Sequence, residues 1–287
     1  MTALDATTHT PDLAAGTVAP AIELSSARLA LGERVLWDGL DLRVEPGEFI
    51  AVLGPNGSGK TTLLKVLLGQ RALSGGTVSV DGAPAGARNT RIGYIPQQQT
   101  MDVETPLRAR DLVGLGLDGH RLGLRPFGWR ARRDRIDAAL EAVGATAYAN
   151  MPVGRLSGGE QQRLRVAQAL AGDPTVLLCD EPLLSLDLAN QRVVSRLIDR
   201  RRLDAGTAVL FVTHEINPVL PLVDRVLYLV NGKFRIGPPS EVMTTEVLSQ
   251  LYGTQVDVLR IRDRIVVVGA DEPPAHCGHQ LDGPGHG

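Results

Sequence analysis

The sequence predicts an α/β protein with a mostly parallel sheet, a small N-terminal antiparallel β subdomain and an inserted α-helical subdomain. Short apolar runs, typical of strands buried on both faces, alternate with helix-length segments, which is the pattern of parallel strands joined by helices. The first such run, residues 49–53, leads into a glycine-rich loop and then a helical segment. The 287 residues, 43 % of them apolar, are enough for a sizeable core.

The N-terminal part is expected to form the antiparallel subdomain. Residues 21–44 mostly alternate apolar and polar side chains, are broken at Gly32 and end at Glu45-Pro46-Gly47, which indicates short strands joined by turns. After the glycine-rich loop a helix is expected over residues 61–68, because Gly69 follows as a helix cap.

The rest of the chain contains further strands and helices. Residues 105–149 are rich in Leu, Ala and Arg, which predicts a separate helical lobe. One helix is expected after Ser157, and another runs through Arg202. The other expected strands are residues 77–80, 91–95, 175–179 and 208–213, followed by a hairpin of residues 256–259 and 265–268.

This pattern divides the chain into four segments. Residues 1–20 lack a basic start and a sustained apolar core, so we expect a disordered leader and no secretory signal. Residues 21–253 form the main domain, with the helical subdomain at about 98–165. Residues 254–270 are a β-hairpin extension, and residues 271–287 are a Gly, Pro and His-rich tail that we expect to be disordered.

Composition excludes several classes of protein. The net charge of -2, from 30 basic and 32 acidic residues, gives no general footprint for nucleic acid, and no nucleic-acid partner is expected. No segment approaches the roughly 20 apolar residues that cross a bilayer, so membrane work would require a partner. Cys179 and Cys277 predict no disulfide framework, which fits a reducing cytosol.

The glycine-rich loop fits the phosphate-loop pattern G-x-x-x-x-G-K-[ST], in the expected place between a strand and a helix. Its glycines let backbone N–H groups converge on phosphates, Lys60 reaches the β and γ oxygens, and Thr61 can ligate Mg²⁺. The loop residues are Gly54, Pro55, Asn56, Gly57, Ser58, Gly59, Lys60, Thr61 and Thr62.

Two acidic residues end the buried strand at residues 175–179. The carboxyl end of a parallel strand is where ligands bind in such sheets, and two adjacent acids there require a cation. Asp180 is expected to hold Mg²⁺ through water, and Glu181 to polarise the water that attacks the γ-phosphorus.

A capping-box pattern at Ser157 narrows the choice of family. Ser157 stands before the expected helix, Glu160 follows three residues later, and Gly158 and Gly159 permit close backbone approach. The segment Leu156-Ser157-Gly158-Gly159-Glu160-Gln161-Gln162-Arg163 resembles the signature of the ATP-binding-cassette (ABC) family, and the resemblance extends over residues 22–253. It implies ATP and Mg²⁺ as ligands and ATP hydrolysis as the activity.

The resemblance also assigns residues outside the phosphate loop. Gln97 in Tyr94-Ile95-Pro96-Gln97 resembles the glutamine that contacts Mg²⁺ and the attacking water, and His214 resembles the switch histidine at the γ-phosphate. Ser185-Leu186-Asp187 resembles the loop that joins two subunits. Leu31 replaces the aromatic residue that stacks on adenine in the family, which leaves base discrimination open.

The family resemblance implies an assembly of several chains. In the family the signature helix of one subunit completes the ATP site of the other, so a homodimer or paired cassette is expected as a head-to-tail ATP sandwich. Integral membrane permease subunits would bind this pair at the cytoplasmic face of the membrane, and an extracytoplasmic substrate-binding protein would act on it indirectly.

The cargo is predicted less directly. Thr105-Pro106, Asp111-Leu112-Val113 and the ending at residues 248–253 resemble zinc and manganese importers. An iron-chelate or cobalamin-type importer and a soluble non-transport ABC ATPase remain alternatives. The tail motif His276-Cys277-Gly278-His279 is either a transition-metal site or part of a polar tail, and a polar tail is favoured because a second paired ligand set is missing.

Overall fold

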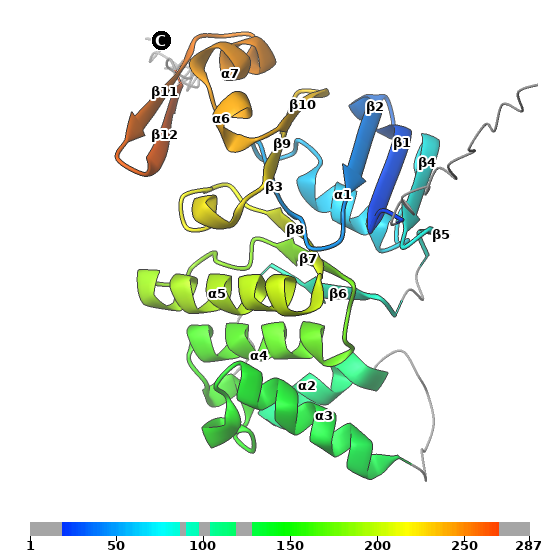
Figure 1. Cartoon of the computed structure of the whole chain (residues 1–287), viewed down its shortest axis with the longest axis vertical. Helices are drawn as coiled ribbons and strands as arrows, with labels where there is room; N and C mark the ends of the chain where they lie inside the picture. Colours follow the sequence, from blue (N-terminus) through cyan, green and yellow to red (C-terminus); the bar gives the residue numbers. More distant parts are fainter. Residues whose placement is uncertain (1–18, 87–89, 98–103, 119–127, 270–287) are drawn as a thin grey trace, which may run out of the picture.

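A computed structural model describes residues 19–86, 90–97, 104–118 and 128–269. Residues 1–18 of the predicted leader and the whole tail with its His-Cys-Gly-His motif lie outside the described residues. The described chain forms an elongated molecule, with three helices at one end and the antiparallel sheet and C-terminal hairpin at the other (Figure 1).

The centre of the molecule is a six-stranded sheet in the order β10-β9-β3-β8-β7-β6. All neighbouring pairs are parallel except β9 and β10. The predicted mostly parallel sheet is therefore confirmed. Its strands are β3 (Phe49–Leu53), β6 (Ile92–Ile95), β7 (Val176–Asp180), β8 (Ala208–Val212), β9 (Arg225–Val230) and β10 (Lys233–Gly237).

The N-terminal sheet is antiparallel, as predicted, with the order β2-β1-β4-β5. Its strands are β1 (Ile22–Leu31), β2 (Arg34–Val44), β4 (Gly75–Val80) and the short β5 (Ala83–Pro84). Apolar side chains of β1 and β2 and of helix α1 (Lys60–Leu67) share one core with one face of the central sheet. The helix that opens at the phosphate loop is thus held by packing on its apolar side.

The other face of the central sheet is covered by helices. Alternate residues of β3, β7 and β8 point into a second core, which also contains the helices of the lobe. Helix α5 lies next to the sheet, and α4, α2 and α3 lie beyond it (Figure 1). These helices are α2 (Ala109–Asp118), α3 (Trp129–Ala142), α4 (Gly158–Ala171) and α5 (Leu188–Ala205).

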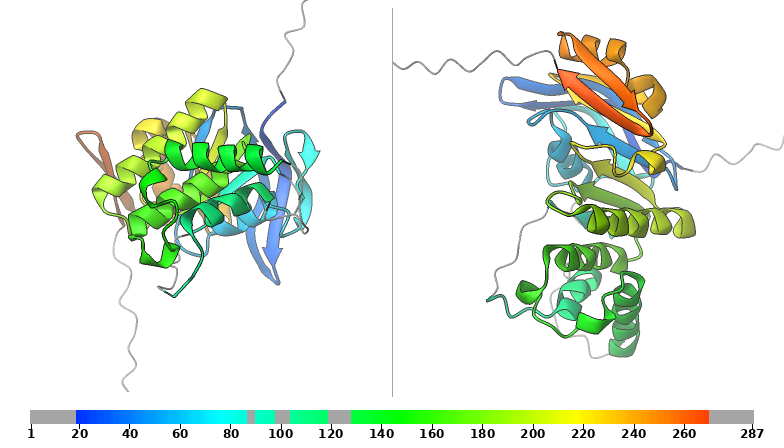
Figure 2. Two further views of the ribbon diagram at one scale, coloured as in Figure 1. Left: turned by 90° about the horizontal axis from the view of Figure 1, so that it is seen from below. Right: turned by 90° about the vertical axis from the view of Figure 1, so that its left-hand side faces the viewer.

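After β8 the chain builds elements that the sequence analysis only partly predicted. The hairpin of β11 (Val256–Ile261) and β12 (Arg264–Gly269) was expected, whereas the β9–β10 hairpin and α6 (Pro239–Val242) and α7 (Thr245–Tyr252) were not. The β11–β12 hairpin projects beside α7 and lies over the loop that follows β8 (Figure 2). This position brings the end of the chain close to the candidate site.

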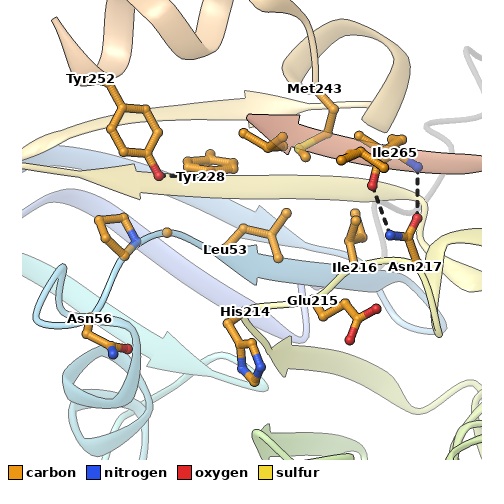
Figure 3. Close-up of a pocket in the computed structure, with 14 residues that line it drawn as sticks. Leu53, Asn56, His214, Glu215, Ile216, Asn217, Tyr228, Met243, Tyr252 and Ile265 are labelled. Atoms are coloured by element: carbon orange, nitrogen blue, oxygen red, sulfur yellow. Dashed lines mark hydrogen bonds between the residues drawn. The ribbon is translucent and has the colours of Figure 1, made fainter. Parts of the chain in front are cut away.

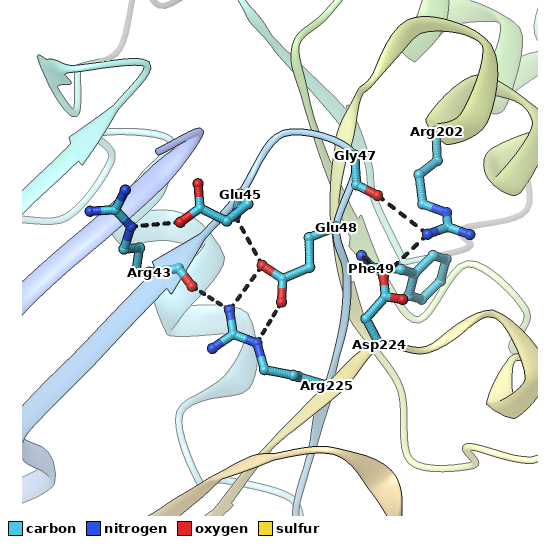
Figure 4. Close-up of polar contacts among 8 residues, drawn as sticks. All are labelled: Arg43, Glu45, Gly47, Glu48, Phe49, Arg202, Asp224 and Arg225. Carbon is cyan, nitrogen blue, oxygen red and sulfur yellow. Dashed lines mark hydrogen bonds and ion pairs between the residues drawn. The ribbon is translucent and has the colours of Figure 1, made fainter. Parts of the chain in front are cut away.

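An ion-pair network connects the two sheets at the edge opposite the phosphate loop (Figure 4). The Glu48 carboxylate accepts hydrogen bonds from Arg225 Nε at 2.5 Å, Arg225 Nη2 at 2.8 Å and Glu45 N at 2.9 Å. Arg202 reaches Asp224 at 3.1 Å, and Asp224 in turn accepts from Phe49 N at 2.8 Å. The start of β3 is therefore fixed from both sides.

We expect Glu48→Gln to lower the free energy of unfolding by about 1–2 kcal/mol, because the 14 % exposed carboxylate makes charge-assisted bonds that an amide cannot replace. Urea titration would measure this. The matched control is Asp204→Asn, which removes the exposed pair with Arg200 and should change stability by less than about 0.5 kcal/mol. Equal losses in the two variants would contradict a special role for Glu48.

Candidate ATP site

Four neighbouring strands of the central sheet end at one edge and deliver the predicted residues there. Strands β3, β8, β7 and β6 are adjacent and parallel, so their carboxyl ends lie side by side. The phosphate loop follows β3, and His214 follows β8 by two residues. Asp180 is the last residue of β7 and Glu181 follows it, while Gln97 follows β6. Ligands of such sheets bind at this edge.

The phosphate loop wraps tightly around the start of α1. At Gly54, where φ is 138°, an added Cβ would lie 2.0 Å from the carbonyl oxygen of Leu229, so only glycine fits. Gly59, with φ 102°, precedes α1, and its Cβ would lie 3.0 Å from the indole nitrogen of Trp37. Trp37 is fully buried and supports the loop from below. It is therefore not a substitute for the missing adenine-stacking residue.

Lys60 points back over its own loop. Its side-chain nitrogen donates to the backbone oxygens of Gly54 at 2.7 Å and Pro55 at 3.0 Å. The residue is only 6 % exposed, and this burial lowers the pKa of the ammonium group, while the nearby charges of Glu181 and Asp180 act in the opposite direction. The buried cation is thus held in place by its own loop.

Asp180 connects the end of β7 with α1 and β6. One carboxylate oxygen accepts from the Thr61 hydroxyl at 3.1 Å, and the other accepts from the Tyr94 hydroxyl at 3.4 Å. Burial is the largest cause of the raised pKa of Asp180, and the Thr61 hydrogen bond partly opposes it. Burial also raises the pKa of Tyr94 to about 12, so this hydroxyl stays protonated and remains a donor at neutral pH.

Glu181 follows Asp180 in a left-handed backbone conformation, with φ 48°. Its N–H donates to the carbonyl oxygen of Val212 at 3.0 Å, which fixes this turn to β8. Its carboxylate lies 3.6 Å from His214 Nδ1; the Glu181 side chain is 16 % exposed and the His214 side chain 54 %. Non-glycine residues are uncommon in the left-handed backbone region, and those that occur there are often found in functional turns.

The structure brings most of the predicted residues to one open cavity of about 620 Å³. Gln97, Glu181 and His214 line it together with the phosphate loop. Leu31, which is 38 % exposed, also lines it, so a leucine does stand at the rim of the site. The loop residues in the lining are Asn56, Gly57, Gly59, Lys60, Thr61 and Thr62.

The signature residues lie elsewhere. The predicted capping box exists: Ser157 Oγ accepts from Glu160 N at 3.3 Å, and Glu160 Oε2 accepts from Ser157 N at 2.8 Å. These bonds with Ser157 lower the pKa of Glu160. Of the described residues that line the phosphate-loop cavity, none belongs to the segment 157–160. Within one chain the two halves of the predicted site are therefore separate.

Gly159 allows the signature helix to touch α5. An added Cβ would lie 2.5 Å from the side-chain amide of Asn190, in the first turn of α5. Asp187 caps this helix by accepting from Asn190 N at 2.7 Å. The signature and the Ser185-Leu186-Asp187 loop are thus in mutual contact through Asn190.

Comparison with known proteins settles the family. A model of the ABC transporter family matches residues 37–184, which include the phosphate loop, the signature and the Asp180-Glu181 pair. The chain belongs to the ABC transporter family. As members of this family the homologous domains are ATPases, and this chain is an ATP-binding and ATP-hydrolysing protein.

Three relatives extend the match beyond the family domain. The manganese transport system ATP-binding protein MntB of Bacillus subtilis is 33 % identical over 251 residues, covering 88 % of this chain and 99 % of that protein. The zinc transport system ATP-binding protein TroB of Treponema pallidum is 34 % identical, over 82 % and 88 % of the two chains. The hemin import ATP-binding protein HmuV of Streptomyces coelicolor is 36 % identical, over 80 % and 82 %.

Solved structures agree with this fold. An ABC transporter of metal-chelate type in an inward-facing conformation superposes with a TM-score of 0.72 at 26 % identity, over 88 % of this chain and 97 % of that chain. The ATP-binding cassette MJ0796, solved as a dimer bound to ADP and Pi, gives a TM-score of 0.64 at 28 % identity, over 76 % and 98 %.

The ABC protein's own residues fit a magnesium nucleotide. The Ser58 hydroxyl is buried and has no hydrogen-bond partner among the described residues, so the loop has an unused polar atom at the site where phosphate is expected. The start of α1 has no side-chain cap, which leaves its backbone N–H groups available for an anion. Thr61 and Asp180 are oxygen donors of the kind that Mg²⁺ prefers.

Two residues of the candidate ATP site were not predicted from the sequence. Tyr94 was noted only as the start of the segment leading to Gln97, yet its hydroxyl bonds to Asp180. Arg34 lines the cavity and donates to the carbonyl oxygen of Gly57 at 3.0 Å. No local pattern could have placed Arg34 there, because it comes from the separate antiparallel sheet.

Proposed function

We propose that the chain energises the import of divalent metal ions, zinc or manganese, through membrane permease subunits. The main support is the match to the manganese MntB protein, which covers 99 % of that relative. The zinc TroB protein supports the same class of cargo. Among the described residues, no helix has the length and apolar composition to cross a membrane. As in the transport systems that these relatives are named for, the energy of hydrolysis would be used through separate membrane subunits at the cytoplasmic face.

Import of an iron chelate is the second candidate. The hemin HmuV protein is 36 % identical, close to the 33 % and 34 % of the MntB and TroB proteins, and a structural neighbour is described as being of metal-chelate type. The ATP site gives no reason to prefer one cargo, because the cargo does not touch it. The third alternative is a soluble ABC ATPase without a transport role. Co-purification of the chain with membrane proteins would distinguish an importer subunit from such an ATPase.

For phosphate binding we assign the loop residues Gly54 to Thr62, with Lys60 as the main cation. Lys60 is already directed at the space above the loop, and the N–H groups of α1 add a favourable dipole. Thr61 and Asp180, joined at 3.1 Å, would hold Mg²⁺ together with Gln97. When bound, the metal neutralises charge on the β and γ oxygens.

For hydrolysis we assign Glu181 as the residue that polarises the attacking water. It stands at the end of β7 in the cavity, with His214 3.6 Å away to contact the γ-phosphate and Gln97 on the same wall. The left-handed turn at Glu181 directs its side chain to this place. Leu31 offers an apolar surface for the base, with a weaker contact than an aromatic ring would give.

We assign Ser157, Gly158, Gly159 and Glu160 to the ATP site of a second subunit. They lie at the start of α4, where Ser157 is exposed, and away from the phosphate loop of their own chain. Two chains arranged head to tail would close two sites, and ATP between them would favour the closed dimer. Hydrolysis would reopen it and move the permease through contacts near Gln97 and the helical lobe. An extracytoplasmic binding protein would select the cargo.

The proposal also keeps the division of the chain expected from the sequence. Residues 21–253 act as the ATPase domain, with the helical subdomain at about 98–165, and residues 254–270 are a hairpin extension. The grouping of α2, α3 and α4 at one end of the molecule supports a lobe of this extent.

The test is uptake of labelled zinc, manganese and hemin by cells that lack the gene and are complemented with the wild-type chain or with Glu181→Gln. We expect wild-type complementation to restore zinc or manganese uptake, and the variant to leave it absent. Restoration of hemin uptake alone would replace the proposal by its second candidate. Restoration of none, with no membrane protein co-purifying, would contradict a transport role.

A further inference from the structure

The loop between β8 and β9 carries His214 on a short and partly anchored segment. The Thr213 hydroxyl bonds to the backbone of Glu215, accepting from N at 3.1 Å and donating to O at 2.9 Å. Ile216 and Val219 are buried and fix the loop from below. The His214 side chain is 54 % exposed, and its Nδ1 lies 3.6 Å from Glu181 Oε2, which is too far for a hydrogen bond. Its position thus depends on how the loop backbone is held.

One side of this loop borders an open space. A cavity of about 480 Å³ lies between the loop and the C-terminal hairpin, and it is lined by His214 and Ile216 of the loop and by Ile265 of β12 (Figure 3). Ile216 and Ile265 are both buried in the same core, but apolar packing is non-directional and does not specify an orientation. A polar bridge between the loop and the hairpin fixes the orientation as well.

Asn217 forms that bridge. Its side-chain amide donates to the carbonyl oxygen of Ile265 at 2.9 Å and accepts from the N–H of the same residue at 2.8 Å (Figure 3). The amide thus pairs with β12 as a neighbouring strand would, at both its donor and its acceptor. This pairing specifies both the distance and the orientation of the loop.

The hairpin is a firm support for this bridge. Ile265 is 4 % and Val256 3 % exposed, and both belong to the large core on that face of the central sheet. On the other strand, Ser249 Oγ accepts from Val256 N at 3.0 Å and donates to Val256 O at 3.1 Å. The hairpin is therefore anchored to α7 independently of Asn217.

We propose that Asn217 is a positioning residue for ATP hydrolysis. Its hydrogen bonds to the C-terminal hairpin hold the His214 loop in the position that catalysis requires. The hairpin extension thereby becomes part of the ATPase mechanism, although it touches no nucleotide. This inference depends on the proposed role of His214 at the γ-phosphate. A displacement of a catalytic group by a fraction of an ångström to 1 Å lowers turnover strongly while the main phosphate contacts persist.

The rival explanation is that Asn217 only attaches the hairpin. Ser249 provides the matched control, because it makes the same kind of donor and acceptor pair with one backbone residue of the same hairpin. Asn217 and Ser249 differ in which segment they hold: the His214 loop or α7. A purely structural role would make the two variants alike.

The experiment measures kcat and KM for ATP in the full-length chain. We expect Asn217→Ala to lower kcat roughly ten-fold with KM changed less than about two-fold, and Ser249→Ala to keep kcat within about two-fold. Asn217→Asp keeps the shape and one acceptor but loses the donor, so its kcat should also fall. If the Asn217→Ala variant does not fold, kcat of the Asn217→Asp variant provides the test instead. Equal kcat losses at Asn217 and Ser249, no loss at Asn217, or a change in KM alone would overturn the proposal.

A double variant separates this inference from the proposed function. In a His214→Ala background, Asn217→Ala should lower kcat no further, because it acts through the missing imidazole. Additive losses would overturn the positioning role. If His214→Ala alone keeps full turnover, the proposed role of His214 is wrong; if it loses turnover while Asn217→Ala does not, only this inference fails.

Discussion

Glu181→Gln is expected to reduce ATP hydrolysis by about two orders of magnitude or more while ATP still binds, in line with the size of general-base effects. The carboxylate lies in the phosphate-loop cavity, 3.6 Å from His214, and its backbone is fixed to Val212. Glutamine has the same shape, so the turn and the phosphate contacts persist. It cannot accept a proton from water, and chemistry should be the only step affected.

Turnover and nucleotide binding must be measured on the same Glu181→Gln sample, by phosphate release and by calorimetry. Glu141→Gln is the matched control, because Glu141 is an exposed carboxylate in α3 of the helical lobe. It should hydrolyse ATP like the wild type. Undiminished turnover in Glu181→Gln would show that another group activates the water.

Lys60→Ala is expected to weaken ATP binding roughly 10- to 100-fold, since a charge-assisted bond of about 1.5–3 kcal/mol is lost. The ammonium is 6 % exposed and is already held above the loop by Gly54 and Pro55, so little reorganisation is needed to meet a phosphate. Unchanged affinity by calorimetry would contradict this assignment.

The control for Lys60→Ala is Lys65→Ala, one turn further along the same helix. Lys65 is exposed, and its replacement should leave ATP affinity within about three-fold, because exposed charges are screened by solvent. Lys60→Ala should not lower the midpoint of unfolding, because the substitution removes a buried ammonium group. Burial of this charge is unfavourable, and the same burial lowers the pKa of Lys60. A Lys60→Ala variant that is folded but binds ATP weakly would show that Lys60 acts in ATP binding and not in stability.

The phosphate loop and the capping box were predictable because each is formed by residues that are close together in the sequence. The phosphate loop is a strand, a turn and a helix in sequence, and the capping box spans Ser157 to Glu160. The parallel sheet was predictable for a similar reason: β3, β7 and β8 are apolar runs buried on both faces.

The β9–β10 hairpin was missed, although a signal was present. The two strands are joined by Asn231-Gly232, both at positive φ, and this pair is a strong hairpin signal between apolar runs. Its importance for the site could not be read from the sequence. The carbonyl of Leu229 in β9 limits residue 54 to glycine, and such a contact depends on sheet order.

Contacts between distant segments explain the other omissions. Arg34 reaches Gly57 from the antiparallel sheet, and Asn217 bonds Ile265 across 48 positions of sequence. Trp37 is buried beneath Gly59, a contact that the sequence around residue 37 does not indicate. Periodicity and motifs describe neighbours in sequence, and these residues act on neighbours in space.

We propose that each ATP site is completed by the signature of a second chain. The most direct test is the molar mass of Glu181→Gln in solution by light scattering, with and without magnesium ATP. The account predicts a 30.6 kDa monomer without nucleotide, a dimer of twice that mass with it, and a monomer in both conditions when Ser157→Arg is added. A monomer that binds ATP with unchanged mass would contradict the account.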